Sequence, residues 1–208
     1  MLKFYFTPFS RSTGVHWLLE ELGIPYEPVV IDIRQPGGVP ESYRAIQPNK
    51  KVPAIDHDGT VVTERAAICQ YLTEVFPQAG LAPLPGDAKR SAFLTWIVYC
   101  DSVFDPCLAA HAQNIDYRRS AFSFGSFDDM MANLDKQLAR HPFAIGDTFS
   151  AVDTQLASGI HFGINILKAM PATPVFEAYL GRCMARPAFQ RAMEREGAAA
   201  KDVTPMSF

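Results

Sequence analysis

The sequence contains few cysteines and no cluster of them. Its four cysteines are Cys69, Cys100, Cys107 and Cys183, and no two of them form a C-x-x-C pair. Metal sites and disulfide scaffolds depend on regular cysteine spacing, so the sequence excludes both as the basis of the fold, and no metal is expected. Reduced thiols are typical of a cytoplasmic protein, which is the location we expect.

Basic runs and long apolar runs are absent as well. The 19 Lys and Arg residues against 22 Asp and Glu give a formal net charge of −3. We expect no nucleic-acid partner, because neutralising phosphates requires clustered cations. No charged segment precedes an apolar run at Met1, and no apolar run of about 18 residues follows, so neither a signal peptide nor a membrane span is expected. Small molecules or proteins are the expected partners.

What the sequence does contain is enough apolar material for a core, 48% of its residues, and a clear change of period near its start. Residues 2–6 alternate apolar and polar side chains, which predicts a strand. Residues 15–22 repeat apolar side chains at helical spacing and end at Gly23, and residues 26–33 again favour a strand. This order predicts a βαβ unit.

A hairpin and a further helix complete the predicted N-terminal domain. Asp58-Gly59 is a favoured turn pair between two apolar-alternating arms. Residues 64–76 carry an apolar helical face, and Pro77 prevents the helix from continuing. We therefore expect an α/β domain over residues 1–77.

The remainder is predicted to be a linker followed by helices. Residues 78–87 are rich in proline and glycine, which neither a helix nor a central strand tolerates. Residues 88–208 show only helical apolar stripes, so the second domain is expected to be all-α. Ser150 and Asp153 have the spacing of a capping box and predict a helix start.

Taken in order, these pieces resemble a cytosolic glutathione S-transferase of the bacterial, serine-bearing type. Five stretches across nearly the whole chain carry the likeness: SRSTGVHWLLEELGIPYE, QPNKKVPAIDHDG, TERAAICQYL, FAIGDTFSAVD and RPAFQRAME. The resemblance implies a thioredoxin-like N-terminal domain that binds glutathione, a helical domain that lines the second-substrate site, and a homodimer. Glutathione would be a co-substrate, with no separate cofactor.

The polar corner between the first strand and helix is the expected catalytic region. A hydroxyl at a helix N-terminus can donate to the glutathione sulfur and stabilise its thiolate. A hydrogen bond to a charged group contributes about 1.5–3 kcal/mol, enough to lower the thiol pKa by about one to two units. We rank Ser10 first as this donor and keep Ser12 as the alternative; either could instead only cap the helix. Arg11 stands where the cysteine-bearing branch of the family has its cysteine.

Glutathione contacts follow from the resemblance. Val52 would pair its backbone with the cysteine of glutathione, as a peptide adds to a sheet edge, and Pro53 would be cis. Lys51 could meet the glycine carboxylate or lie in solvent. Glu64 matches the acidic residue that receives the γ-glutamyl ammonium. Arg65 replaces the usual serine, and could either pair the γ-glutamyl carboxylate or face the dimer interface.

The second substrate is expected to be an apolar electrophile, because aromatic residues are dense in the helical part. Phe9, Tyr99 and Phe104 are the expected pocket residues. The leading hypothesis is a detoxifying transferase whose glutathione sulfur attacks an electrophilic carbon or reduces a peroxide or disulfide. The alternative is a non-catalytic binding or scaffold protein of the same fold. A specialised isomerase or dehalogenase is a third reading, although the SSCSW-like corner of maleylacetoacetate isomerases is absent.

Overall fold

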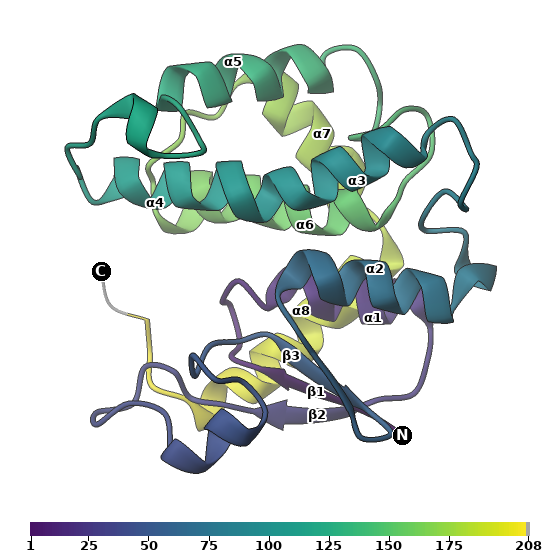
Figure 1. Cartoon of the computed structure of the whole chain (residues 1–208), viewed down its shortest axis with the longest axis vertical. Coiled ribbons are helices and arrows are strands. Elements are labelled where there is room, and N and C mark those ends of the chain that lie inside the picture. The colour runs from purple at the N-terminus through teal and green to yellow at the C-terminus, as the bar shows by residue number, and fades with distance from the viewer. Residues whose placement is uncertain (207–208) are drawn as a thin grey trace. The chain divides into compact units, whose positions relative to one another are not determined.

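A computed structural model describes residues 1–206, which form two compact units. Unit 1 comprises Met1–Ala79 together with the chain from Arg186 onward, and unit 2 comprises Gly80–Ala185. The first boundary lies close to the predicted end of the N-terminal domain. The second differs from the expectation, because the described C-terminal segment, residues 186–206, belongs to unit 1 and not to the helical unit (Figure 1).

Unit 1 is built on a mixed sheet of four strands, in the order β2-β1-β3-β4. The strands are β1 (Leu2–Phe6), β2 (Glu27–Val30), β3 (Ala54–His57) and β4 (Thr60–Thr63). β1 pairs parallel with β2 and antiparallel with β3, and β3 pairs antiparallel with β4. The predicted βαβ unit and hairpin are therefore both present. Asp58 and Gly59 both have positive φ, which this hairpin turn requires.

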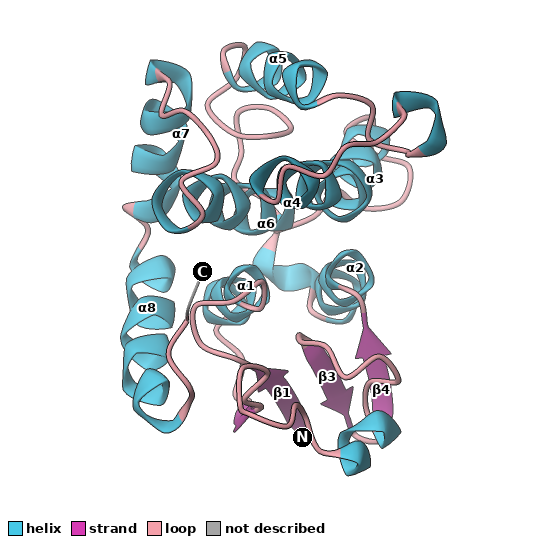
Figure 2. Ribbon diagram, turned by 90° about the vertical axis from the view of Figure 1, so that its left-hand side faces the viewer, coloured by secondary structure: helices cyan, strands magenta, loops and turns pink. Residues whose placement is uncertain are grey.

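Helices α1 (Thr13–Leu22) and α2 (Arg65–Val75) lie on one face of this sheet (Figure 2). The alternation along β1 determines which side chains meet them. Phe4 and Phe6 are fully buried, and their rings lie 5.3 Å and 5.0 Å from the His16 ring of α1. Tyr5 points to the opposite face, where its ring lies 5.8 Å from that of Tyr43.

Helix α8 (Pro187–Ala199) packs beside α1, which explains why the C-terminal segment joins unit 1. The ring of Phe189 lies 4.8 Å from the buried Trp17 ring. Arg186 donates to both carboxylate oxygens of Glu21, at 2.6 Å and 2.7 Å. The apolar stripe predicted for this helix was correct, but a stripe does not identify the surface that it covers.

Unit 2 is helical, as expected. Its helices are α3 (Arg90–Tyr99), α4 (Asp105–Ala112), α5 (Phe127–Leu138), α6 (Ala151–His161) and α7 (Pro174–Met184), with π-helical turns over Cys100–Phe104 and Phe162–Ile166. Ser150 and Asp153 form both bonds of the predicted capping box at the start of α6. Of the eleven residues of α6, only His161 is not buried, so this helix forms the centre of the unit.

One helical run in unit 2 is long. Arg90–Ala112 continues through α3, a π-helical turn and α4 for 23 residues, with mean hydropathy 1.2 in its most apolar window. By length and composition alone this run could cross a membrane, which the sequence reading did not anticipate. Its buried side chains pack on α5 and α6, and a core helix of a globular protein passes the same test.

Candidate functional site

Strand pairing brings the predicted glutathione-binding segments to one end of the sheet. Tyr5 of β1 pairs with Ala54 of β3, and Ala54 pairs with Thr63 of β4. The corner after β1, the loop before β3 and the start of α2 after β4 therefore emerge together. These three segments hold all of the sequence-predicted catalytic and glutathione-binding residues: Ser10, Ser12, Lys51, Val52, Pro53, Glu64 and Arg65.

The two serines of the corner bond to each other. The Ser10 hydroxyl donates to the Thr7 carbonyl at 2.7 Å, and the two serine oxygens lie 2.8 Å apart. Because Ser10 has one hydrogen, Ser12 is the donor between the two hydroxyls. The Ser12 amide also donates to the Ser10 oxygen, at 3.1 Å. Every hydrogen-bonding position of the Ser10 hydroxyl is thus occupied.

Ser12 is less accessible than Ser10. Its side chain has no exposed surface, whereas Ser10 retains 9%. Ser12 occupies the N-cap position of α1 without a side-chain capping bond. Instead its hydroxyl accepts from the Thr7 amide at 3.4 Å. Simple helix capping, the expected alternative role, is therefore not what Ser12 does; its hydroxyl ties the end of β1 to the corner.

The loop before β3 has the form implied by the family resemblance. The Val52–Pro53 peptide bond is cis. Pro53 is buried, Val52 is half-buried and Lys51 is exposed. The Tyr43 hydroxyl donates to the Lys51 carbonyl at 3.1 Å, and the Lys51 amide donates to the Gln47 side chain at 3.2 Å. The backbone of Lys51, directly before Val52, is therefore held at its amide and its carbonyl by side chains of unit 1.

Glu64 and Arg65 stand at the start of α2 in different environments. Glu64 is exposed and has φ 67° and ψ 123°, which ends β4 and turns the chain into the helix. Arg65 is only 7% exposed. Little of the Arg65 side chain is thus exposed, and this burial limits a contact with a second copy of the chain and a contact with glutathione alike.

The three residues expected to line a second-substrate pocket lie in different settings. Phe9 is 40% exposed in the corner of unit 1. Tyr99 of α3 is half-buried, 4.8 Å from the Trp96 ring. Phe104 has no exposed surface. The expectation that Phe104 lines a substrate pocket is therefore corrected. A fully buried ring packs in the core and has no exposed surface for a substrate.

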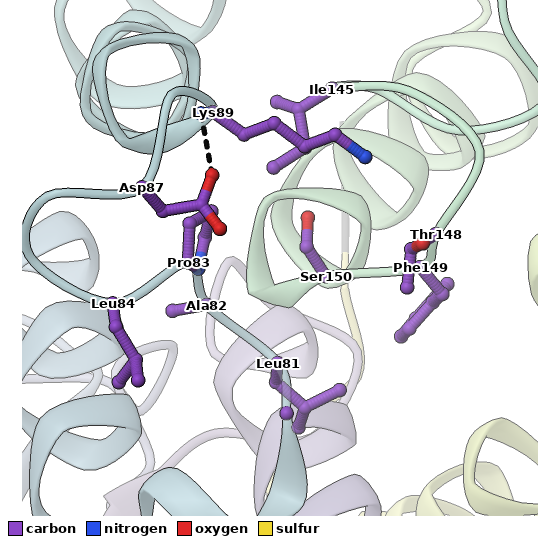
Figure 3. A pocket seen from close by; sticks show the side chains of 11 residues that line it. Leu81, Ala82, Pro83, Leu84, Asp87, Lys89, Ile145, Thr148, Phe149 and Ser150 are labelled. Atoms are coloured by element: carbon purple, nitrogen blue, oxygen red, sulfur yellow. Dashed lines mark hydrogen bonds between the residues drawn. The ribbon is translucent and has the colours of Figure 1, made fainter.

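Unit 2 has a pocket of its own of about 270 Å³ beside the start of α6 (Figure 3). Leu81, Leu84 and Phe149 are among its apolar lining, and Asp87 and Ser150 are among its polar lining. Asp87 accepts the Lys89 amide at 2.7 Å. None of the expected second-substrate residues lines this pocket, so the aromatic density of the sequence did not predict it.

A polar network behind the corner was missed by sequence reasoning. His16 is 1% exposed and lies between Glu196 of α8, at 3.2 Å, and the Tyr26 hydroxyl, at 2.9 Å. Both ring nitrogens of His16 therefore have a hydrogen-bonding partner within the core. Tyr26 in turn donates to Glu20 at 2.7 Å. Glu196 falls on the same helical stripe as Phe189 and Ala192, and an acidic residue on an apolar stripe was the available signal.

The electrostatics of this network follow from its bonds. Burial raises the pKa of Tyr26, and its donation to Glu20 raises it further. Burial alone would raise the pKa of Glu20, but hydrogen bonds from Tyr26 and Arg191 and the charge of Arg195 lower it overall. Glu20 is therefore a carboxylate held in place by donors from α8.

Comparison with known proteins agrees with this fold. Residues 3–80 match the family model for the glutathione S-transferase N-terminal domain. A glutathione transferase from Methylococcus capsulatus has the same fold with a TM-score of 0.80, at 28% identity, over 95% of this chain and 100% of that one. Residues 3–80 thus match the glutathione S-transferase N-terminal domain family, and the chain has the fold of a glutathione transferase.

Two further matches show the range of similarity. A sphingomonad glutathione S-transferase solved in complex with glutathione has a TM-score of 0.74, at 28% identity, over 94% of this chain and 98% of that one. Protein LigF of Sphingobium sp. (strain NBRC 103272 / SYK-6) is 36% identical over 110 residues, which are 52% of this chain and 43% of LigF. Other relatives are named as transferases and as isomerases.

Proposed function

We propose that this protein is a glutathione transferase that binds glutathione at the end of the unit 1 sheet and presents its thiolate to an apolar electrophile. Reduction of a peroxide or disulfide by the same sulfur is the related possibility. The observation that carries the proposal is the convergence of Ser10, the cis Val52–Pro53 bond and Glu64–Arg65 at one sheet end. Glutathione in the related sphingomonad structure supports it.

Ser10 is the proposed activating donor, because it retains exposed surface and Ser12 does not. To donate to sulfur, the Ser10 hydroxyl hydrogen has to turn away from the Thr7 carbonyl. A neutral hydrogen bond of about 0.5–1.5 kcal/mol is then exchanged for a charged one of about 1.5–3 kcal/mol. The net gain of about 1 kcal/mol lowers the thiol pKa by somewhat less than one unit, at about 1.36 kcal/mol per unit.

The remaining roles are assigned by position. The Val52 backbone pairs with the cysteinyl part of glutathione, and Lys51 meets its glycine carboxylate. Glu64 receives the γ-glutamyl ammonium, and Arg65 its carboxylate. Phe9 and Tyr99 remain proposed contacts of the electrophile. Detoxification in the cytoplasm is the proposed setting.

We further propose that the protein is a homodimer. Leu94 and Val98, four residues apart on α3, are 37% and 45% exposed. Two large apolar side chains at this spacing share one helix face, which a second copy could cover.

Calorimetric titration with glutathione, combined with the ultraviolet thiolate absorbance of the complex across pH, tests the proposal. The expected result is saturable binding and a bound thiol that ionises below its free value of about 8.5. Absence of binding at millimolar glutathione would refute the transferase assignment.

A non-catalytic binding protein of the same fold is the second candidate. The observation that favours it is the fully occupied hydrogen bonding of Ser10, since a donor already satisfied by Thr7 need not be a catalyst. Binding of a protein partner without glutathione and without turnover would establish this candidate.

A further inference from the structure

The corner that carries Ser10 has an unusual backbone. Phe9, directly before Ser10, has φ 53°. Residues other than glycine adopt this left-handed region infrequently, and a surrounding structure has to hold them there. The contacts of the Pro8–Phe9 turn identify what holds it.

Glu196 of α8 contacts the turn from one side. Its carboxylate has no exposed surface. Oε2 accepts the Phe9 amide at 2.7 Å and the Thr13 hydroxyl, at the first residue of α1, at 2.9 Å. One buried carboxylate oxygen thus joins the residue before Ser10 to the helix after it, from a position 187 residues away in the chain.

Arg34 holds the turn through its carbonyl groups. Its guanidinium donates to the Pro8 carbonyl at 3.0 Å and to the Phe9 carbonyl at 3.2 Å. Asp32 accepts the Arg34 amide at 2.9 Å, and its other oxygen accepts the amide and hydroxyl of Thr204 at 2.9 Å and 2.7 Å. The C-terminal segment therefore reaches the corner twice, directly through Glu196 and indirectly through Thr204, Asp32 and Arg34.

The direction of each hydrogen bond in the Tyr26–His16–Glu196 chain can be assigned by counting the available hydrogens. Tyr26 gives its hydroxyl hydrogen to Glu20, so His16 Nε2 has to donate to the Tyr26 oxygen. The contact of 3.2 Å between His16 Nδ1 and Glu196 Oε1 needs a hydrogen of its own. A hydrogen therefore lies between His16 Nδ1 and Glu196 Oε1. A glutamine at position 196 could make the same bonds, since its amide nitrogen would donate to a neutral His16.

We infer that Glu196 is a positioning residue for Ser10. Together with Arg34, it clamps the backbone of the Pro8–Phe9 turn. The clamp consists of Glu196, Arg34 and Asp32. It acts by fixing the backbone from which the Ser10 hydroxyl reaches the glutathione sulfur, and this inference rests on the proposed function of Ser10. The chemistry at the corner thus depends on the C-terminal helix.

The test compares Glu196→Ala, Glu196→Gln and Arg34→Met with wild type and Ser10→Ala. Glu194→Ala, which removes an exposed glutamate of the same helix, is the control. Three quantities are measured for each protein: amide hydrogen exchange of Phe9 without ligand, the pKa of the bound glutathione thiol, and kcat and KM for a model electrophile. Arg34→Met keeps the clamp testable if Glu196→Ala does not fold.

We expect Glu196→Ala to speed Phe9 amide exchange at least tenfold. We also expect it to raise the bound thiol pKa as far as Ser10→Ala does, and to lower kcat about three- to tenfold with a smaller change in KM for glutathione. A variant that carries both Ser10→Ala and Glu196→Ala should show no further rise in the bound thiol pKa, because both substitutions remove the same interaction. For Glu196→Gln, the exchange rate, the thiol ionisation constant and the kinetic constants should lie within about twofold of wild type. Arg34→Met should give values between those of wild type and Glu196→Ala.

Three results would overturn the inference. An unchanged Phe9 amide exchange rate in both Glu196→Ala and Arg34→Met would mean that neither residue holds the Pro8–Phe9 turn. A bound thiol pKa that Ser10→Ala raises and Glu196→Ala does not would mean that the clamp is unrelated to Ser10. Failure of wild type to bind glutathione would refute the proposed function and the role of the clamp in it, while the exchange data would still report whether Glu196 holds the turn.

Discussion

The Tyr179 hydroxyl donates a hydrogen bond to the Asp153 carboxylate at 2.9 Å, although the two residues lie 26 positions apart in the chain. Asp153 also accepts the amides of Ala144 and Ser150, at 2.7 Å and 2.8 Å. Both side chains have no exposed surface. One carboxylate therefore joins the start of α6, the loop before it and α7.

Breaking this junction should destabilise unit 2. Tyr179→Phe keeps the packing of the ring and removes one donor, so we expect a loss of about 1.5–3 kcal/mol in the free energy of unfolding. Asp153→Asn replaces one acceptor oxygen with an amide NH2 group that faces hydrogen-bond donors, and should cost about 1–3 kcal/mol. Urea unfolding measures both. A double variant no worse than Asp153→Asn is expected, since the two changes act on one bond, and full additivity would contradict the arrangement.

The serine pair predicts different consequences for its two members. Ser10→Ala should raise the pKa of the bound glutathione thiol by somewhat less than one unit and leave the fold intact. Ser12→Ala removes a buried hydroxyl that bonds both Ser10 and the Thr7 amide, so it should lower stability by about 1–3 kcal/mol. Thiolate absorbance across pH and urea unfolding separate the two effects. The reverse pattern would identify Ser12 as the donor.

Arg65 provides a test of how glutathione is held. If its guanidinium pairs the γ-glutamyl carboxylate, Arg65→Ala should lose about 1.5–3 kcal/mol of binding, or about 10- to 150-fold in Kd. Arg65→Lys should recover only part of this, because an ammonium cannot form a two-bond fork. Calorimetry gives the affinity. Light scattering on the same samples would reveal monomers with unchanged affinity, which would favour the interface role.

Gly163, in the π-helical turn after α6, has no room for a side chain. A methyl group there would lie 2.5 Å from the Met170 sulfur and 3.1 Å from Leu108 Cδ2. Gly163→Ala should therefore destabilise by about 1–3 kcal/mol through overpacking. Gly181→Ala is the matched control, because its methyl group meets nothing within 4 Å in the middle of α7. That change should stabilise by about 0.5–1 kcal/mol, and equal effects at both positions would contradict the steric argument.

Glu20 should make stability depend on acid pH. Its folded pKa lies below the ordinary value of 4.5, so the unfolded chain binds the proton more tightly. The stability contributed by Glu20 is complete above about pH 4.5 and is lost as the pH falls through the folded pKa. Urea unfolding at pH 7, 5, 4 and 3 should show a smaller acid loss in Glu20→Gln than in wild type. Glu194→Gln serves as the control for removal of an exposed charge, and identical acid losses in all three proteins would refute the assignment.

The sequence by itself determined the elements of this protein and their order. Alternation along β1, the Asp58-Gly59 turn, the helical stripes and the Ser150–Asp153 capping box are all local patterns, and each is present in the structure. Local patterns suffice here because the period of apolar residues and the φ that a turn needs are set within a few neighbouring residues. The resemblance to a known family added the cis Val52–Pro53 bond, which no local rule would have favoured.

Only the tertiary structure decided which surfaces meet. Helix α8 was assigned to the helical domain because its stripe resembles any other, yet it packs on α1 and carries Glu196 to the corner. The aromatic ring of Phe104 was expected in a pocket and is in the core. The His16–Glu196 contact and the Arg34 bonds likewise join residues that are distant in the chain. Such bonds depend on sheet register and helix packing over long sequence separations, which no short stretch of sequence encodes.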